Sequence, residues 1–299
     1  MKKKVLVLSG GGVRGTIQLE QLNRIEKKAG KRICDEFDLI VGTSVGAITG
    51  GILATGKLSM PSYAKLFLNI IRQIFKRAPI WKFWRRFSLP KYKRDVFFHY
   101  MDKKIGKNIT MNKCKTKFIC TSVNLVDNRT HYFKSWEKKD GKLKLKDIIA
   151  RSFAAPYYFG MIIDNKKRAL WVDGGMGLSN CPVDIAYIET LRQGWTEVEF
   201  TVIGTGYSDY SFTFDSGRRK KTLNLILKYI SPEKGGLARV QSTHNKILRL
   251  QEIDKLQKNI TLNYYDVHIN KKYNKMDAVK YVSTYLSYGH KVSKINLKK

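Results

Sequence analysis

The chain has 299 residues, of which 43% are hydrophobic and 12% aromatic, so it is globular and long enough to bury a sizeable core. Its 57 Lys and Arg residues outnumber 24 Asp and Glu residues, which gives a net charge of +33. So large a positive field draws a protein to polyanions, and the two expected classes of partner are anionic lipid surfaces and nucleic acid.

The sequence argues against secretion, membrane spanning and metal binding. Only Val5 to Leu8 separate the basic N-terminus from the first glycines, which is too short for a signal-peptide core. No stretch reaches the roughly 18 uninterrupted apolar residues of a spanning helix. The four cysteines have no metal-site spacing, so we expect free thiols in the cytoplasm. These are Cys34, Cys114, Cys120 and Cys181.

The first predicted elements form a strand, a glycine loop and a helix. Residues 4–9 are apolar, Gly10 to Gly15 read GGGVRG, and a helix is predicted over residues 16–29. Glycines beside a helix N-terminus expose N–H groups that bind anions. The loop also matches the dinucleotide fingerprint G-x-G-x-x-G, and Asp35 lies 20 residues beyond Gly15. A dinucleotide site therefore stays open, although Asp35 precedes the next strand instead of ending it.

The next strand leads into the pattern G-x-S-x-G. Residues 39–41 are apolar, and Gly42-Thr43-Ser44-Val45-Gly46 precedes a helix of small and apolar residues. A sharp strand-to-helix turn lifts such a serine hydroxyl out at the top of a sheet. The glycines allow the backbone to turn without Cβ clashes. The pattern makes Ser44 a candidate nucleophile.

A basic, aromatic segment follows, because residues 39–94 contain eleven Lys or Arg and no Asp or Glu. Apolar residues from Tyr63 to Phe75 recur on one helix face, which favours core packing. The next cluster interleaves aromatic rings with cations, as interfacial membrane anchors do, and stacking on single-stranded nucleic acid uses the same residue types. Its candidate membrane contacts are Trp81, Phe83, Trp84, Arg85, Arg86 and Phe87.

Beyond this segment the sequence alternates helices and strands, and one strand ends at an aspartate. Helices are predicted at residues 95–105, 146–152, 223–229, 237–256 and from about 277, and strands at 118–125, 130–133, 161–163, 169–172, 197–203 and 262–269. The strand at 169–172 delivers Asp173, followed by Gly174 and Gly175, so Asp173 is a candidate catalytic carboxylate. Standing alone, this triplet would be a turn-forming Asp-Gly pair.

Taken together and in this order, GGGVRG, GTSVG, SFAAPYYF (residues 152–159) and DGG resemble the patatin-like phospholipase family. The resemblance implies a Ser–Asp dyad with Ser44 as nucleophile and Asp173 as base, and no cofactor. It also implies a three-layer α/β fold with a central, mostly parallel sheet. The matching oxyanion-hole loop comprises Gly10, Gly11, Gly12, Arg14 and Gly15. Many members have Asn-Asn-Pro after DGG, where this chain has Ser179-Asn180-Cys181-Pro182.

We therefore expect one domain over residues 1–299, with a basic aromatic helical cap inserted at about 57–110. The expected activity is phospholipase A or lysophospholipase hydrolysis at anionic membranes, with peripheral membrane association and no metal. Besides the dinucleotide site, two alternatives stay open. A Ser-His-Asp hydrolase would use His244, His268 or His290, which all follow Asp173 in the chain. A non-catalytic protein on the same fold would bind nucleic acid or anionic membranes through its charge.

Overall fold

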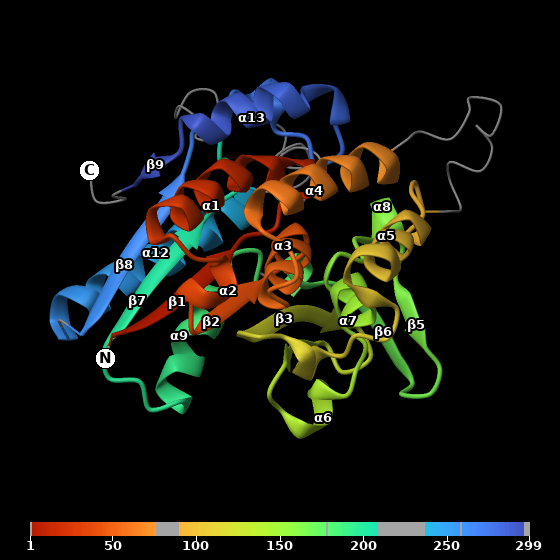
Figure 1. The fold of residues 1–299 in the computed structure, drawn as a ribbon, viewed down its shortest axis with the longest axis horizontal. Helices are drawn as coiled ribbons and strands as arrows, with labels where there is room; N and C mark the ends of the chain where they lie inside the picture. The colour runs from red at the N-terminus through yellow and green to blue at the C-terminus, as the bar shows by residue number, and fades with distance from the viewer. Residues whose placement is uncertain (1, 76–89, 178, 209–236, 258, 296–299) are drawn as a thin grey trace, which may run out of the picture.

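The computed structural model describes residues 2–75, 90–177, 179–208, 237–257 and 259–295. Within these residues the chain builds one nine-stranded sheet in the order β5-β6-β3-β2-β1-β7-β8-β9, with β4 paired to β3 (Figure 1). Five neighbouring strands run parallel. They are β1 (Lys3–Leu8), β2 (Leu39–Gly42), β3 (Lys117–Asn124), β7 (Val198–Ile203) and β8 (Ile260–Asp266).

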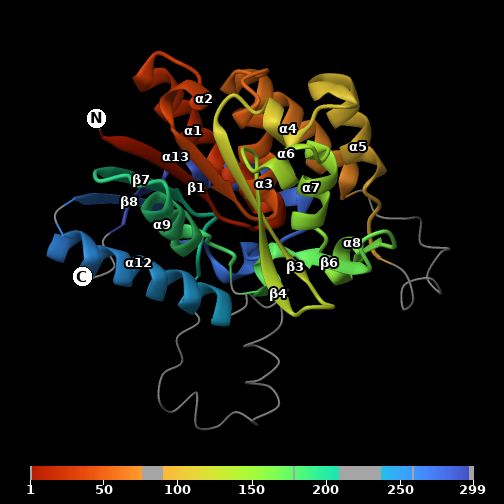
Figure 2. The ribbon, with the colours of Figure 1, turned by 90° about the horizontal axis from the view of Figure 1, so that it is seen from below.

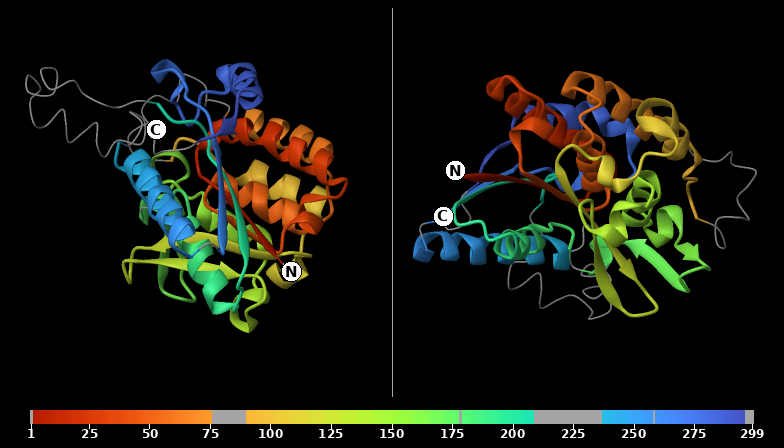
Figure 3. Two further views of the ribbon diagram at one scale, coloured as in Figure 1. Left: turned by 90° about the vertical axis from the view of Figure 1, so that its left-hand side faces the viewer. Right: turned by 60° about the horizontal axis from the view of Figure 1, so that its bottom comes forward.

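Side chains alternate along these strands and feed two separate cores. On β1, Leu6 and Leu8 point into one core, whereas Val5 and Val7 point into the other. Because both faces of the parallel block are apolar, helices must cover both. The first core is covered by α1 (Thr16–Ala29), α3 (Val45–Ala54), α4 (Met60–Ile74) and α13 (Val282–His290), and the second by α9 (Val183–Arg192) and α12 (Leu237–Gln257). Figure 3 shows the sheet between these two helix layers.

The sheet turns antiparallel at one end. There β3 pairs with β4 (Arg129–Lys134) and with β6 (Ala169–Asp173), and β6 pairs with β5 (Ile162–Asp164). Ile119 of β3 pairs with both β2 and β4, and Ser122 pairs with both β6 and β4. Therefore β2 and β6 lie along the same edge of β3 and approach each other end to end.

The predicted three-layer α/β architecture is confirmed, and so are most element positions. Three predicted boundaries are wrong: the helix α5 ends at Met101 and continues as a π turn to Gly106, β8 ends at Asp266, and α13 begins at Val282 after a 3₁₀ turn. Among the remaining short elements, the sequence predicts α5 (Asp95–Met101) and α7 (Leu145–Ser152). It does not predict α2 (Ile33–Glu36), α6 (Lys138–Gly141), α8 (Pro156–Phe159) or β9 (Ser293–Lys294).

The amphipathic helix α4 packs as its sequence pattern indicates. Tyr63, Phe67 and Ile70 on its apolar face are at most 1% exposed and join the first core. All four cysteines are free, as expected. The candidate membrane contacts from Trp81 to Phe87 and the helix predicted at 223–229 lie outside the described residues. The single domain with a cap at about 57–110 stays a prediction.

Candidate active site

The end-to-end approach of β2 and β6 brings two motifs together across Thr121 of β3. Gly42 at the end of β2 pairs with Cys120, and Asp173 at the end of β6 pairs with Ser122. The Thr43 and Thr121 hydroxyls are hydrogen-bonded at 2.7 Å in this gap. A Cβ on Gly174 would collide with Thr121. Two motifs that lie about 130 residues apart in the chain therefore meet because they share one strand edge.

Close backbone packing explains the glycines on either side of Ser44. A Cβ on Gly42 would collide with the Gly46 carbonyl, and a Cβ on Gly46 would collide with the carbonyl oxygen of Leu8. Ser44 itself has φ 56° and ψ −121°, a conformation that non-glycine residues rarely adopt. The turn between β2 and α3 thus holds Ser44 under strain at the N-terminus of α3.

The Ser44 hydroxyl donates a hydrogen bond to Asp173 Oδ2 at 2.7 Å. Both residues are 6% exposed, so the pair is largely shielded from water. The Gly175 N–H donates to Asp173 Oδ1 at 2.8 Å and fixes the carboxylate, and the Ser44 N–H donates to Ser152 Oγ at 2.9 Å. A carboxylate held in this way can take the hydroxyl proton as the serine oxygen attacks.

The glycine loop lies against Ser44, and its carbonyl groups are anchored. A Cβ on Gly10 would lie 3.1 Å from Ser44 Cβ, so the two backbones are in contact. The Gly10 N–H donates to the Asn180 carbonyl at 2.9 Å. The Gly10 carbonyl accepts hydrogen bonds from Thr205 Oγ1 at 2.8 Å and Asn180 Nδ2 at 3.3 Å.

The next two amides of the loop differ from that of Gly10. Within the described residues, the N–H groups of Gly11 and Gly12 donate no hydrogen bond. Because a trans peptide places C=O and N–H on opposite sides, the anchored Gly10 carbonyl fixes the direction of the Gly11 N–H. The Gly11 carbonyl accepts from the Arg14 N–H at 3.3 Å, which fixes the Gly12 N–H in the same way.

Arg14 is 1% exposed and ties the loop to the C-terminal part of the chain. Its guanidinium donates to the carbonyls of Gly11 (3.5 Å) and Gly206 (3.3 Å) and to Asn274 Oδ1. Gly15 is buried at the start of α1, where a Cβ would press on Val45. Arg14 therefore supports the loop through geometry that its planar fork of donors makes specific.

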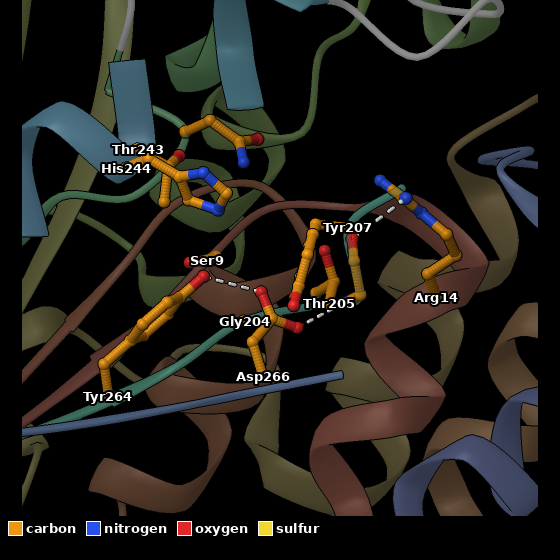
Figure 4. Close-up of a pocket in the computed structure, with 11 residues that line it drawn as sticks. Ser9, Arg14, Gly204, Thr205, Tyr207, Thr243, His244, Tyr264 and Asp266 are labelled. Atoms are coloured by element: carbon orange, nitrogen blue, oxygen red, sulfur yellow. Dashed lines mark hydrogen bonds between the residues drawn. The ribbon is translucent and has the colours of Figure 1, made fainter. Parts of the chain in front are cut away.

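A cavity of about 30 Å³ lies behind the glycine loop, with room for about one water molecule. Figure 4 shows Tyr264 and Asp266 turned toward each other in it, with His244 of α12 nearby. Asp266 accepts from the Tyr264 hydroxyl and the Gly206 N–H, both at 2.7 Å. Burial raises the pKa of Asp266, opposed by these hydrogen bonds and by the Arg14 charge. Ser44 and Asp173 do not line this cavity.

The alternative site residues lie elsewhere. No histidine among the described residues hydrogen-bonds the Ser44 hydroxyl. His244 lines the cavity behind the loop, His268 stacks edge-on against Tyr207, and His290 contacts Glu20 at the surface. Asp35, the acidic residue of the dinucleotide pattern, pairs with Lys115 at 2.6 Å. Within the described residues no group of three His, Cys, Asp or Glu side chains is placed to hold a metal ion.

Sequence reasoning missed Ser152, Asn180 and Thr205. Ser152 belongs to SFAAPYYF and Asn180 follows DGG, and Thr205 lies in Gly204-Thr205-Gly206, directly after β7. The sequence carries no signal for their partners, which are backbone groups of distant segments.

The family model for patatin-like phospholipases matches residues 6–187, a span that contains both Ser44 and Asp173. The chain belongs to the patatin-like phospholipase family. Among curated proteins it is 31% identical to a cGAMP-activated phospholipase from Escherichia coli and 29% identical to one from Vibrio cholerae. Each match covers 70% of this chain, and 64% and 66% of those relatives, respectively. A patatin-like protein 2 from rice (Oryza sativa subsp. indica) is 29% identical over 59% of this chain and 50% of its own length.

Two solved structures align with most of this chain. VipD from Legionella pneumophila matches with a TM-score of 0.43 and 12% identity, over 99% of this chain and 68% of VipD. The type III effector ExoU matches with a TM-score of 0.40 and 10% identity, over 98% of this chain and 54% of ExoU. Among the described residues, no helix is both long and apolar enough to span a bilayer.

Proposed function

We propose that this protein is a serine lipid acyl hydrolase of the phospholipase A or lysophospholipase type, with Ser44 as nucleophile and Asp173 as base. The observation that carries the proposal is the 2.7 Å hydrogen bond from the Ser44 hydroxyl to Asp173 Oδ2 at a strained strand-to-helix turn. Family membership supports phospholipase activity in general, and the dyad supports the finer assignment.

The reaction has two half-steps. Ser44 Oγ bonds to the acyl carbon while its proton passes to Asp173, and the carbonyl oxygen becomes an oxyanion. Collapse breaks the ester bond, the leaving alcohol takes the proton from Asp173, and the acyl group stays on Ser44. Water then attacks the acyl-enzyme with Asp173 again accepting a proton, which returns to Ser44 as the fatty acid leaves.

The N–H groups of Gly11 and Gly12 are the proposed oxyanion donors. Neither N–H donates a hydrogen bond within the described residues. The anchored carbonyl of the preceding residue fixes the direction of each N–H. The Gly10 N–H is already donated to Asn180, so Gly10 contributes the anchor instead. Donors fixed before the reaction stabilise the oxyanion without reorganisation, and one such donor is typically worth about 2.7 to 4 kcal/mol.

The proposed substrate phase is an anionic phospholipid membrane, on which the protein binds peripherally. The net charge of +33 supports this choice, since each basic residue near an anionic leaflet contributes roughly 1 kcal/mol. Because two of its bacterial relatives are named cGAMP-activated phospholipases, cGAMP is also the proposed activator. Salt should weaken vesicle binding, as surface charges are screened beyond about 10 Å at 0.1 M.

Fatty-acid release from mixed zwitterionic and anionic liposomes tests the proposal, with and without cGAMP. Wild type should release fatty acid, and Ser44→Ala and Asp173→Asn should each fall below about one thousandth of that rate. Release that survives Ser44→Ala would refute the nucleophile. If no variant releases fatty acid, a serine-reactive fluorophosphonate probe decides: labelling of wild type but not Ser44→Ala supports the site. No labelling favours the non-catalytic alternative.

A further inference from the structure

The antiparallel end of the sheet has one packed face and one exposed apolar face. On the packed face, Trp171 is 4% exposed, and its ring lies 5.2 Å from that of Phe133 and 4.8 Å from the Arg151 guanidinium. On the other face, Ile163 is 63% exposed. A strand that alternates between faces normally presents polar side chains to water. The exposed apolar face therefore requires an explanation.

The exposed residues Ile163 and Leu125 flank the half-buried Leu170 of β6 in one row across the sheet. Ile163 of β5 pairs with Leu170 of β6, and the Leu125 N–H at the end of β3 donates to the Leu170 carbonyl at 2.8 Å. Residues directly opposite on paired strands point to the same face. We define the apolar rim as five aliphatic residues of this end, each 45% to 63% exposed. They are Leu125, Val126, Met161, Ile163 and Met176.

The apolar rim and Asp173 are connected through β6 and the turn that follows it. Met176 lies three residues after Asp173, in the 3₁₀ turn Gly174–Gly177 that packs on β3, where a Cβ on Gly177 would press on Val123. Leu170 lies three residues before Asp173 on the same strand. At about 3.3 Å per residue, the Cα atoms of Leu170 and Asp173 are about 10 Å apart along the strand, and strand alternation places their side chains on opposite faces of the sheet.

Four cations surround the apolar rim. Lys166, Lys167 and Arg168 form the exposed turn between β5 and β6, and Arg129 is exposed where β4 begins. None of the four forms an ion pair with another described residue. Because β3 and β6 are antiparallel, the β3–β4 and β5–β6 turns lie at the same end of the sheet, and Figure 2 shows the two hairpins next to each other.

We propose that the apolar rim and its four cations form the face through which the protein docks on an anionic lipid bilayer. Aliphatic side chains enter the headgroup region while the surrounding cations contact lipid phosphates. The inference rests on the proposed function and names the docking surface for that site. It is separate from the segment Trp81 to Phe87.

Vesicle sedimentation in the Ser44→Ala background tests the docking face without product formation. A double variant, Leu125→Asp with Ile163→Asp, should lower the partition coefficient for phosphatidylglycerol-containing vesicles at least tenfold, which corresponds to 1.4 kcal/mol. Leu256→Asp is the matched control, because Leu256 is 82% exposed near the end of α12, at the opposite end of the molecule from β5 (Figure 1). The control should stay within twofold of the parent.

Charge and chemistry are tested separately. Lys166→Glu with Lys167→Glu should weaken binding to anionic vesicles more than tenfold and leave binding to phosphatidylcholine vesicles unchanged. With Ser44 intact, turnover of a soluble short-chain ester should be unchanged by the rim substitutions. If the wild type does not hydrolyse the soluble ester, the proposed function is contradicted. The sedimentation assay still measures docking in that case.

Two results would overturn the docking face. The first is vesicle binding by the Leu125→Asp, Ile163→Asp variant equal to that of the parent. The second is that the parent protein is a dimer in solution, whereas this variant is a monomer with unchanged vesicle binding. The rim would then be a contact between subunits. Unfolding temperatures equal to that of the parent show that the substitutions leave the fold intact, as expected at exposed positions.

Discussion

Thr205→Val removes one hydroxyl from the anchored glycine loop and leaves the shape of the side chain almost unchanged. In the wild type, Thr205 Oγ1 donates to the Gly10 carbonyl at 2.8 Å, and Thr205 is 4% exposed. The variant leaves that carbonyl with the longer bond from Asn180 Nδ2 at 3.3 Å. The Gly10–Gly11 peptide then loses its stronger restraint, and the Gly11 N–H is less well aimed.

The magnitude follows from two limits. A neutral hydrogen bond contributes about 1 kcal/mol net, and complete loss of an oxyanion donor costs about 2.7 to 4 kcal/mol. Because Asn180 still holds the peptide, the effect should lie near the lower limit, at about a fivefold to tenfold fall in kcat, which corresponds to about 1 to 1.4 kcal/mol. KM should change little, since the interaction matters chiefly once the oxyanion has formed. Thr205→Ser keeps the donor and should stay within about threefold of wild type.

The assay is turnover of a soluble ester, with fluorophosphonate labelling as a second readout because its adduct also places an oxygen in the oxyanion hole. Both rates should fall together in Thr205→Val, with the unfolding temperature close to that of Thr205→Ser. A wild-type kcat in Thr205→Val would refute the reasoning. An equal loss in Thr205→Ser would also refute it, because the hydroxyl would then not be the cause.

Three further predictions concern the backbone, the guanidinium and pH. Gly46→Ala should lower the free energy of unfolding by about 1–3 kcal/mol, and by more than Gly50→Ala does. The Cβ added at Gly46 meets the Leu8 backbone, whereas the Cβ added at Gly50 meets only side chains. Chemical unfolding of both variants measures the difference. Arg14→Lys keeps the charge but not the planar fork, so kcat should fall at least tenfold, on the order of 1.4 kcal/mol; wild-type kcat would assign the role to charge alone. Burial favours a raised pKa for Asp277, but bonds from Lys91 (2.5 Å) and Tyr92 (2.8 Å) lower it below its ordinary 3.8. The stabilisation from this carboxylate is therefore present above the unfolded-state pKa and is lost as pH falls through the folded-state pKa. Asp277→Asn should lower the unfolding temperature by about 2 °C at pH 7, and this difference should shrink as the pH falls below 3.8.

The sequence predicted the site residues whose chemistry lies in short motifs. Ser44 was recognisable because its glycines and the preceding strand are adjacent in the chain. Asp173 was recognisable because an apolar strand delivers it. Their meeting was implied by family resemblance, whereas the cause lies in the pairing of β2 and β6 along one edge of β3. Strand order and direction depend on long-range pairing, which local patterns do not encode.

Other features were missed for definite physical reasons. Thr205 acts on the Gly10 carbonyl across 195 residues, and a backbone oxygen leaves no mark in the sequence. Helix α9 buries Val183 and Ala186 but exposes Ile188 and Leu191, so its apolar residues do not lie on one face. The start of α13 was placed too early because residues 279–281 form a 3₁₀ turn that continues into the helix.

Strand β6 links the two proposals, because Leu170 near its start pairs with a rim residue and the proposed base, Asp173, ends it. Leu170 pairs with Ile163, Trp171 fixes the strand to the packed face, and Asp173 accepts a hydrogen bond from the Ser44 hydroxyl. The Cα atoms of Leu170 and Asp173 are about 10 Å apart along this strand. Under the two proposals, a bilayer docked on the rim lies against the same strand that carries the base, so docking and catalysis would be coupled through β6.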